Sequence, residues 1–388
     1  MNYNWLLPEY IEDILPDDAW RVESLRRGLL DLFRGHGYQL VMPPLLEYVE
    51  SLLTGTGRDM DLVTFKLVDQ LSGRHMGLRA DITPQAARID AHLMNRQGVN
   101  RLCYAGSVLR TLPDDSLRTR EPFQIGAELY GHAGIEGDFE VVGLMLAALE
   151  SCGVRSPLVD LGHVGVFRAL LGHAALTPDV AARLFEALQG KDSAALEELT
   201  VGCIPEVADG LRMLPELSGG REVIARARAS LPDWPAIGRA LDELEAVGES
   251  VGGKTPLTYD LAELRGYHYH SGIVFAAYAE GWPDAISKGG RYDEVGKAFG
   301  RSRPATGFSL DLRDVIANQP PVRGARGVLA PRAGPDAALE RTVASLRAAG
   351  EIVVRELPGH ERDRAEQDCD RELTQVDGRW EVRPLRGD

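Results

Sequence analysis

The sequence has 388 residues, of which 44% are hydrophobic and 26% are charged. This length and composition are typical of a globular protein with two or three structural units and a large core. The formal net charge of −15 opposes nucleic-acid binding, which usually needs a basic surface. The sequence also lacks a long apolar run and a basic N-terminal segment, so we expect a cytoplasmic protein without a nucleic-acid or membrane partner.

The first elements in chain order are a long amphipathic helix and a short strand. Leu25, Leu29 and Phe33 recur at helical spacing within residues 18–35. Two glycines follow and end the helix. The strand predicted at residues 38–42 runs into a Pro-Pro pair, so the chain begins with a helix joined to a proline-ended strand.

The middle of the chain alternates strands and helices on both sides of a helical insertion. We expect helices over 84–94 and 137–153, a strand pair over 64–83, strands over 100–112 and 121–131, and a strand followed by a loop over 156–167. Residues 167–250 are rich in Ala, Leu and Glu, which predicts the helical insertion. Strands return within 256–264, 266–279 and 305–316. A linker rich in Pro and Gly at 318–327 then leads into a small α/β unit.

The cysteines and histidines do not predict a disulfide framework or a metal site. The four cysteines lie far apart and form no C-x-x-C pair: Cys103, Cys152, Cys203 and Cys369. His268 and His270 alternate on a predicted strand and could begin a metal site, but a third ligand is not evident. The sequence therefore predicts reduced thiols, no metal and no cofactor.

Three segments together resemble the class II aminoacyl-tRNA synthetases, and the histidyl enzyme in particular. The first helix and its proline-ended strand resemble motif 1, and VLRTLPDDSLRTREPFQIGAELYG resembles motif 2 of the histidyl enzyme. RGYHYHSGIVF and GGRYDEV resemble its two histidine-specific signatures. The resemblance covers roughly residues 5–318 and implies an α+β fold, an antiparallel sheet flanked by helices. We expect this core at 1–318, with the helical insertion at 174–250, and a small C-terminal α/β domain at 319–388.

The resemblance also implies a pocket for histidine. The ligand's ammonium needs acceptors, its carboxylate needs donors, and its ring needs polar partners. Gln124 and Glu128 lie four apart on one predicted strand and therefore point to the same face. The resemblance assigns Asp81 and Thr83 to the ammonium, Arg110 and Arg265 to the carboxylate, and Tyr269 and His270 to the ring. The candidate histidine-binding residues are Asp81, Thr83, Arg110, Gln124, Glu128, Arg265, Tyr269 and His270.

Two of these positions depart from the family pattern. Asp81 is one methylene shorter than the acid that the family has there, which reduces its reach. His270 stands where the family has a second tyrosine, which changes the expected contact with the ring.

The positions that would bind ATP in this family carry different residues. Leu112 replaces the motif 2 glutamate that contacts adenine, and Asp314 replaces the motif 3 arginine that clamps the γ-phosphate. Asp311 also replaces a motif 3 glycine. Two unit charges 4 Å apart interact by about 1 kcal/mol in water and by about 4 kcal/mol at a dielectric of 20, so a carboxylate there repels a triphosphate. Arg313 is the one nearby residue that could substitute for the lost arginine.

Within this family, a histidine-sized pocket without ATP chemistry is the mark of the regulatory subunits of ATP phosphoribosyltransferase. The resemblance then implies a chain with no catalytic site of its own, in a homodimer within a larger hetero-oligomer. Its partner would be the short catalytic subunit for the first step of histidine biosynthesis, and free histidine would be its ligand. An active histidyl-tRNA synthetase and a histidine-sensing module for another partner are the alternatives. The effector could also bind at the subunit interface.

Overall fold

The computed structural model describes residues 5–54, 58–113, 118–174, 176–264, 266–267, 269–298, 300–320, 326–332, 334, 336–359 and 367–385. Internal contacts divide the chain into two compact units, Met1–Pro320 and Pro321–Asp388. Among the residues that the structure describes, no helix is both long and apolar enough to cross a bilayer. Each unit contains its own sheet and is described separately.

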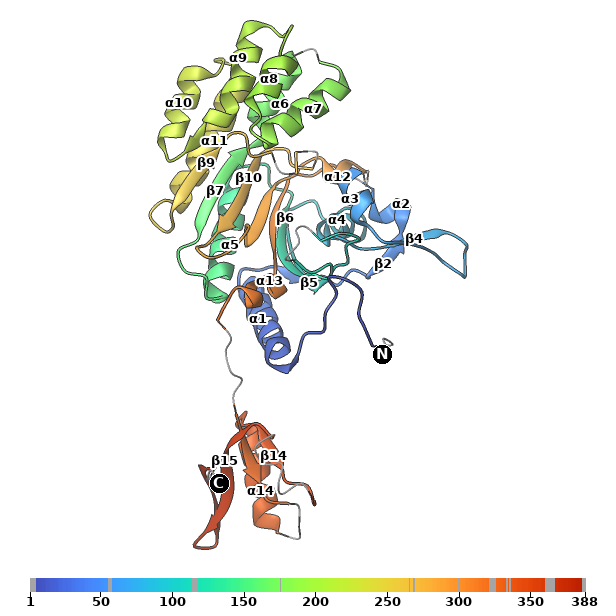
Figure 1. Cartoon of the computed structure of the whole chain (residues 1–388), viewed down its shortest axis with the longest axis vertical. Coiled ribbons are helices and arrows are strands. Elements are labelled where there is room, and N and C mark those ends of the chain that lie inside the picture. Colours follow the sequence, from blue (N-terminus) through green and yellow to red (C-terminus); the bar gives the residue numbers. More distant parts are fainter. Residues whose placement is uncertain are drawn as a thin grey trace. The chain divides into compact units, whose positions relative to one another are not determined.

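The larger unit is built on a nine-stranded mixed sheet (Figure 1). In spatial order its strands are β1 (Gln39–Leu40), β5 (Asn100–Ser107), β6 (Phe123–Tyr130), β12 (Ala305–Asp311), β11 (Ser287–Arg291), β10 (Ile273–Tyr278), β7 (Leu158–His163), β9 (Leu257–Asp260) and β8 (Ser218–Gly219). The central strands pair antiparallel, as expected. The β1–β5 and β7–β9 pairs are parallel, because helices connect these strands and return the chain in the same direction.

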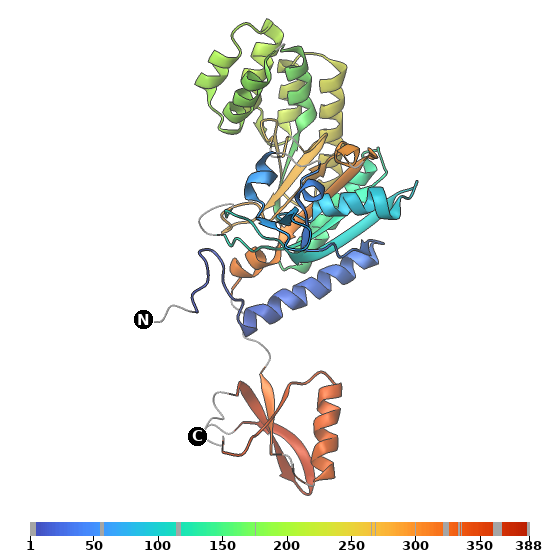
Figure 2. The ribbon, with the colours of Figure 1, turned by 90° about the vertical axis from the view of Figure 1, so that its right-hand side faces the viewer.

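Long helices cover one face of this sheet. α1 (Pro16–Gly35) buries Val22, Leu29 and Phe33, so the predicted helix is confirmed. α1 packs against α5 (Glu136–Ser151) and α13 (Leu312–Ala317), and α5 lies on β6, β11 and β12. Figure 2 shows α1 running along the side of the sheet. Because these helices fill one face, a ligand can reach the central strands from the other face.

Shorter elements surround the opposite face. A three-stranded sheet in the order β2, β4, β3 lies beside α4. α4 continues into a π-helical turn, so the helix predicted over 84–94 is present but changes its winding. The elements are β2 (Leu46–Tyr48), α2 (Val49–Leu52), α3 (Arg58–Val63), β3 (Lys66–Val68), β4 (His75–Leu78), α4 (Thr83–Arg88), the π-helix (Ile89–Met94) and α12 (Val295–Ala298).

The segment for which the sequence predicts a helical insertion contains a cluster of helices beyond one end of the sheet (Figure 1). It consists of α6 (Val164–His173), α7 (Pro178–Gln189), α8 (Ser193–Leu199), α9 (Pro205–Met213), a 3-10 turn (Leu214–Glu216), α10 (Glu222–Ser230) and α11 (Pro235–Val251). The loop expected directly after the strand at 156–162 is wrong. The His163 Nδ1 accepts the backbone N–H of Gly165 at 3.0 Å, and this N-cap starts α6 without an intervening loop.

The smaller unit contains a four-stranded sheet and one helix. Its strand order is β14, β13, β15, β16, with parallel pairs on both sides of β13 and an antiparallel β15–β16 hairpin. Val328, Leu339, Val343 and Leu373 form the centre of its core. The elements are β13 (Gly327–Ala330), α14 (Ala337–Ala348), β14 (Val353–Arg355), β15 (Cys369–Val376) and β16 (Arg379–Pro384).

Candidate functional site

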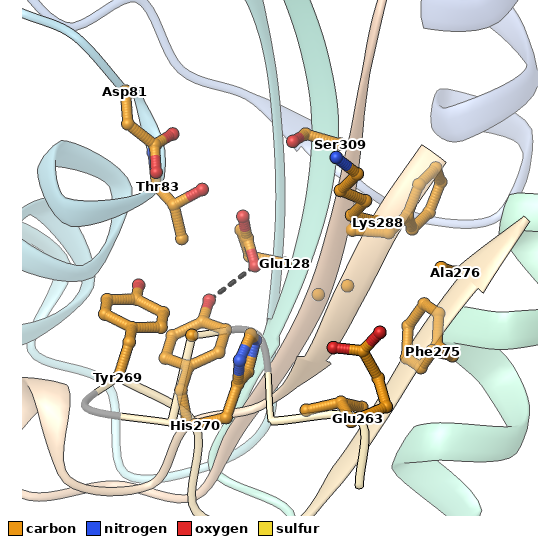
Figure 3. Close-up of a pocket in the computed structure, with 16 residues that line it drawn as sticks. Asp81, Thr83, Glu128, Glu263, Tyr269, His270, Phe275, Ala276, Lys288 and Ser309 are labelled. Atoms are coloured by element: carbon orange, nitrogen blue, oxygen red, sulfur yellow. Dashed lines mark hydrogen bonds between the residues drawn. The ribbon is translucent and has the colours of Figure 1, made fainter. Parts of the chain in front are cut away.

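A pocket of about 230 Å³ opens on the face of the large sheet that α4 borders (Figure 3). Its size suits a small metabolite, because sites for drug-sized ligands are roughly 300–1,000 Å³. The structure brings five of the predicted residues to its lining: Asp81, Thr83, Glu128, Tyr269 and His270. Arg110 and Gln124 line a neighbouring cleft instead, and Arg265 lies outside the described residues.

Glycines on the sheet leave the space that the pocket occupies. Gly307 on β12 pairs with Glu128 on one side and with Gly290 on the other. A Cβ at Gly307 would overlap the Glu128 carboxylate, and a Cβ at Gly290 would lie 2.8 Å from the His270 ring. Gly307 and Gly290 therefore leave the room that the Glu128 and His270 side chains need.

Glu128 is the buried acid at the centre of the pocket. It is 1% exposed, and its carboxylate accepts hydrogen bonds from the Tyr104 hydroxyl at 2.9 Å and from the Tyr292 hydroxyl. Burial raises the pKa of Glu128 to about 8, although both tyrosine hydroxyls stabilise the charged form. Glu128 is therefore largely protonated at neutral pH in the empty pocket, and a cationic ligand would favour its ionised form.

Asp81 and Gln124 form a network beside Glu128. The Asp81 Oδ1 accepts the Thr83 backbone N–H at 3.0 Å and the Gln124 Nε2 at 2.7 Å. The Gln124 Oε1 accepts the backbone N–H of Ile82 at 2.9 Å. Gln124 thus fixes the segment that carries Asp81, and Asp81 and Thr83 face the pocket. Gln124 and Glu128 lie on the same face of β6, but Glu128 lines this pocket and Gln124 lines the neighbouring cleft.

Tyr269 and His270 form the side of the pocket across from Asp81 in Figure 3. The Tyr269 ring lies 4.9 Å from the Tyr292 ring and 5.6 Å from the His270 ring, measured between centroids. The Tyr269 hydroxyl is buried and has no hydrogen-bond partner among the described residues. A ligand with a polar ring atom would supply that partner.

The strand predicted over 266–279 is wrong at its beginning, because β10 starts only at Ile273. Gly266 adopts a φ of +65°, and its carbonyl accepts the backbone N–H groups of Tyr269 and His270, which makes a turn. His270 is therefore not part of a strand, and His268 lies outside the described residues. No cluster of three metal-binding side chains occurs within the part of the chain that the structure describes.

Two charged lining residues were not predicted from the sequence. Glu263 lies in the segment before the turn, and Lys288 lies on β11 directly before the two glycines. The Lys288 Nζ donates to the Asp284 Oδ2 at 2.9 Å. A signal for Lys288 was present, because it alternates with Gly290 on one strand and so faces the same side.

The neighbouring cleft has a volume of about 100 Å³, and its lining includes Arg110, Asp311 and Asp314, three positions compared above with synthetase motifs 2 and 3. Asp314 forms an ion pair with Arg118 at 3.3 Å between Oδ2 and Nε, and Arg118 also lies 3.5 Å from Asp284. Asp311 is half-buried and caps α13, accepting the backbone N–H groups of Phe123 and Arg313 at 2.9 Å. Burial and the charge of Asp314 raise the pKa of Asp311 to about 6. Within this cleft, the charges of Arg118 and Asp314 therefore offset each other.

Arg313 does not take the place of the missing phosphate-binding arginine. Its guanidinium donates to the Glu12 carboxylate at 3.1 Å and to the Glu121 carbonyl at 3.3 Å, and it does not line the cleft. Leu112 is 65% exposed and lines neither cavity. Neither residue offers the cleft a contact for a nucleotide.

Comparisons with known proteins agree with this description. Residues 10–315 match the family described as histidyl-tRNA synthetase. Residues 325–383 match the family described as the ATP phosphoribosyltransferase subunit HisZ C-terminal domain. A relative from Ralstonia nicotianae is 60% identical over 383 residues, which are 99% of each chain. A relative from Cupriavidus necator is 58% identical over 384 residues, which are 99% of this chain and 100% of that one. Both relatives are named ATP phosphoribosyltransferase regulatory subunit.

Solved structures show the same architecture. A Bacillus halodurans protein, described as an ATP phosphoribosyltransferase regulatory subunit/histidyl-tRNA synthetase, superposes with a TM-score of 0.82 at 27% identity. That match covers 94% of this chain and 97% of the other. A histidyl-tRNA synthetase from Nostoc has a TM-score of 0.77 at 18% identity, covering 96% and 91%, and shows the fold alone.

Proposed function

This chain belongs to the histidyl-tRNA synthetase family and, within it, to the ATP phosphoribosyltransferase regulatory subunits, and from this premise we propose that it is a cytoplasmic subunit without a catalytic site of its own. The names of its relatives favour this function over an active synthetase or a sensor for another partner. Its partner is the short catalytic subunit, which joins ATP to phosphoribosyl pyrophosphate in the first step of histidine biosynthesis.

The contrast between the two neighbouring cavities carries the proposal. In one, acids and hydroxyls converge on an open space, and the Tyr269 hydroxyl is left without a partner among the described residues. In the other cavity, Asp314 forms an ion pair with Arg118, and its carboxylate would repel a triphosphate. An amino acid is complementary to the first cavity, and ATP is not complementary to the second.

We assign free histidine to the first cavity. Asp81, Thr83 and Glu128 supply acceptors for its ammonium, and Tyr269 and His270 lie where its ring would bind. Histidine binding would alter how this unit meets the catalytic subunit and so transmit feedback inhibition. Coupling free energies of about 1–3 kcal/mol correspond to roughly 5- to 150-fold control.

The assembly we propose is a homodimer within a larger hetero-oligomer. β1 is a short edge strand of the large sheet and contacts α1. Leu40 in β1 and Met42 after it are 45% and 76% exposed, and Trp20 on α1 is 66% exposed. An edge strand with exposed apolar neighbours is suited to pairing with a second copy. Sedimentation should give at least a dimer, and a monomer of 42.4 kDa at all concentrations would contradict this arrangement.

The test is to reconstitute the complex from separately purified subunits. The catalytic subunit alone should have little phosphoribosyltransferase activity, addition of this chain should restore it, and histidine should inhibit the complex. The chain alone should give no histidine-dependent ATP–pyrophosphate exchange. Exchange above background would identify a synthetase, and an active catalytic subunit that ignores this chain would rule out the proposed role.

A further inference from the structure

We infer that Lys288, and not Arg110, is the residue that binds the carboxylate of the ligand and selects an amino acid over its decarboxylated or reduced analogues. This inference rests on the proposed histidine site. Among the described residues that line the pocket, Lys288 is the only lysine or arginine. Arg110 lines the neighbouring cleft, and its Nε donates to the Ala80 carbonyl at 3.3 Å.

Strand register places Lys288 on the pocket side of the sheet. Lys288 pairs with Ser309 on β12 and with Ala276 on β10, and all three line the pocket. The next row across the sheet runs from Glu128 through Gly307 to Gly290. Lys288 and Glu128 therefore lie on the same face of the sheet. Their strands are separated by β12, and their positions differ by two residues along the strands.

The space between these two side chains fits a zwitterion. Neighbouring strands are about 4.8 Å apart, so the strands that carry Glu128 and Lys288 are separated by about 10 Å. The intervening positions are Gly307, which has no side chain, and Ser309, whose side chain is small, so that space stays open. Figure 3 shows Lys288 beside Ser309, across the pocket from Glu263 and His270. An ammonium at Glu128 and a carboxylate at Lys288 would each meet the opposite charge.

Among the described residues, the ammonium of Lys288 has one hydrogen-bond partner, Asp284, so further donors can bind a ligand. Asp284 accepts one of its three N–H donors at 2.9 Å, and Asp284 also lies near Arg118. Asp284 thus positions Lys288 at the boundary between the two cavities, since Lys288 lines both. A carboxylate bound there would lie at the boundary with the cleft in which Arg118 pairs with Asp314.

The Lys288 side chain is 43% exposed, so solvent screens its charge and the expected effect is moderate. We expect wild type to bind L-histidine about tenfold more tightly than L-histidinol, which has a hydroxyl in place of the carboxylate. In Lys288→Met, histidine affinity should fall by about tenfold to the level of histidinol, while histidinol affinity changes by less than about threefold.

The experiment is calorimetric titration of both ligands into wild type, Lys288→Met and Arg110→Met. If Lys288→Met still binds histidinol, its pocket is intact. Arg110→Met should keep the wild-type preference for histidine over histidinol. The inference is overturned if Lys288→Met weakens the binding of histidine and histidinol equally. It is also overturned if Lys288→Met keeps the preference for histidine over histidinol while Arg110→Met or Arg265→Met loses it. If wild type binds neither ligand, the proposed histidine site itself fails, which is a separate result.

Discussion

The two cavities of the large unit lie side by side on the same strands, yet their polar groups are arranged in opposite ways. In the pocket around Glu128, a buried acid of raised pKa and a buried tyrosine hydroxyl face open space. In the cleft around Asp314, carboxylates and Arg118 are paired with one another. Polar groups that satisfy each other gain little from a ligand, whereas groups that face a cavity are stabilised by one.

The largest expected effect comes from removing the central acid of the pocket. Glu128→Gln should weaken histidine binding by about 100-fold, because a hydrogen bond to a charged group contributes about 1.5–3 kcal/mol. Calorimetry measures the effect. The control is Glu140→Gln, since Glu140 pairs with Arg101 at 2.6 Å and lines neither cavity. Unchanged affinity in Glu128→Gln would place the ligand elsewhere, such as the subunit interface.

The raised pKa of Glu128 should also appear in the stability of the ligand-free chain. Its pKa rises from 4.5, the ordinary value that applies to the unfolded chain, to about 8 in the fold, so the folded chain holds an extra proton between these values. The stability that this proton supports is complete below pH 4.5 and is lost as pH rises through 8. Raising the pH from 6 to 8 should therefore stabilise Glu128→Gln relative to wild type by about 2 kcal/mol in urea unfolding. A difference independent of pH would contradict the shift.

Histidine binding should depend on pH for the same reason. Because the ligand ammonium favours ionised Glu128, binding near neutral pH must release the proton of its carboxyl group. Affinity should rise about fivefold between pH 7 and 8, and calorimetry in buffers with different ionisation enthalpies should detect proton release. Glu128→Gln should lose this dependence, and its retention there would assign the proton to another group.

The smallest expected effect concerns the cleft. The side chains of Arg118 and Asp314 are each 17% exposed, so their interaction should stabilise the fold by about 1 kcal/mol. A double-mutant cycle with Arg118→Met and Asp314→Ala, followed by urea unfolding, measures this coupling. The exposed pair Lys297 and Glu294, 76% and 61% exposed, should give less than about 0.3 kcal/mol. Equal coupling in both pairs would show that the cleft charges are not specially paired.

The sequence predicted most of the elements, because periodicity and glycine or proline boundaries are local properties. The alternation of Gln124 and Glu128 correctly placed them on one face, but not in one cavity. That outcome depends on Ile82 and Asp81, which are remote in sequence and bind Gln124. Lys288 was missed because its position in the pocket follows from pairing with Ser309 on another strand. The start of α6 was misplaced because a histidine, rather than the usual Ser, Thr, Asp or Asn, caps it.

The most direct test of the contrast between the cavities is a pair of titrations on one preparation of the chain. Histidine and ATP with Mg²⁺ are titrated separately into the protein at pH 8, where Glu128 is substantially ionised. The account predicts saturable binding of histidine at one site per chain and no saturable binding of ATP at millimolar concentration. Saturable ATP binding that is lost in Arg118→Met, or the absence of histidine binding both in the chain alone and in the reconstituted complex, would contradict it.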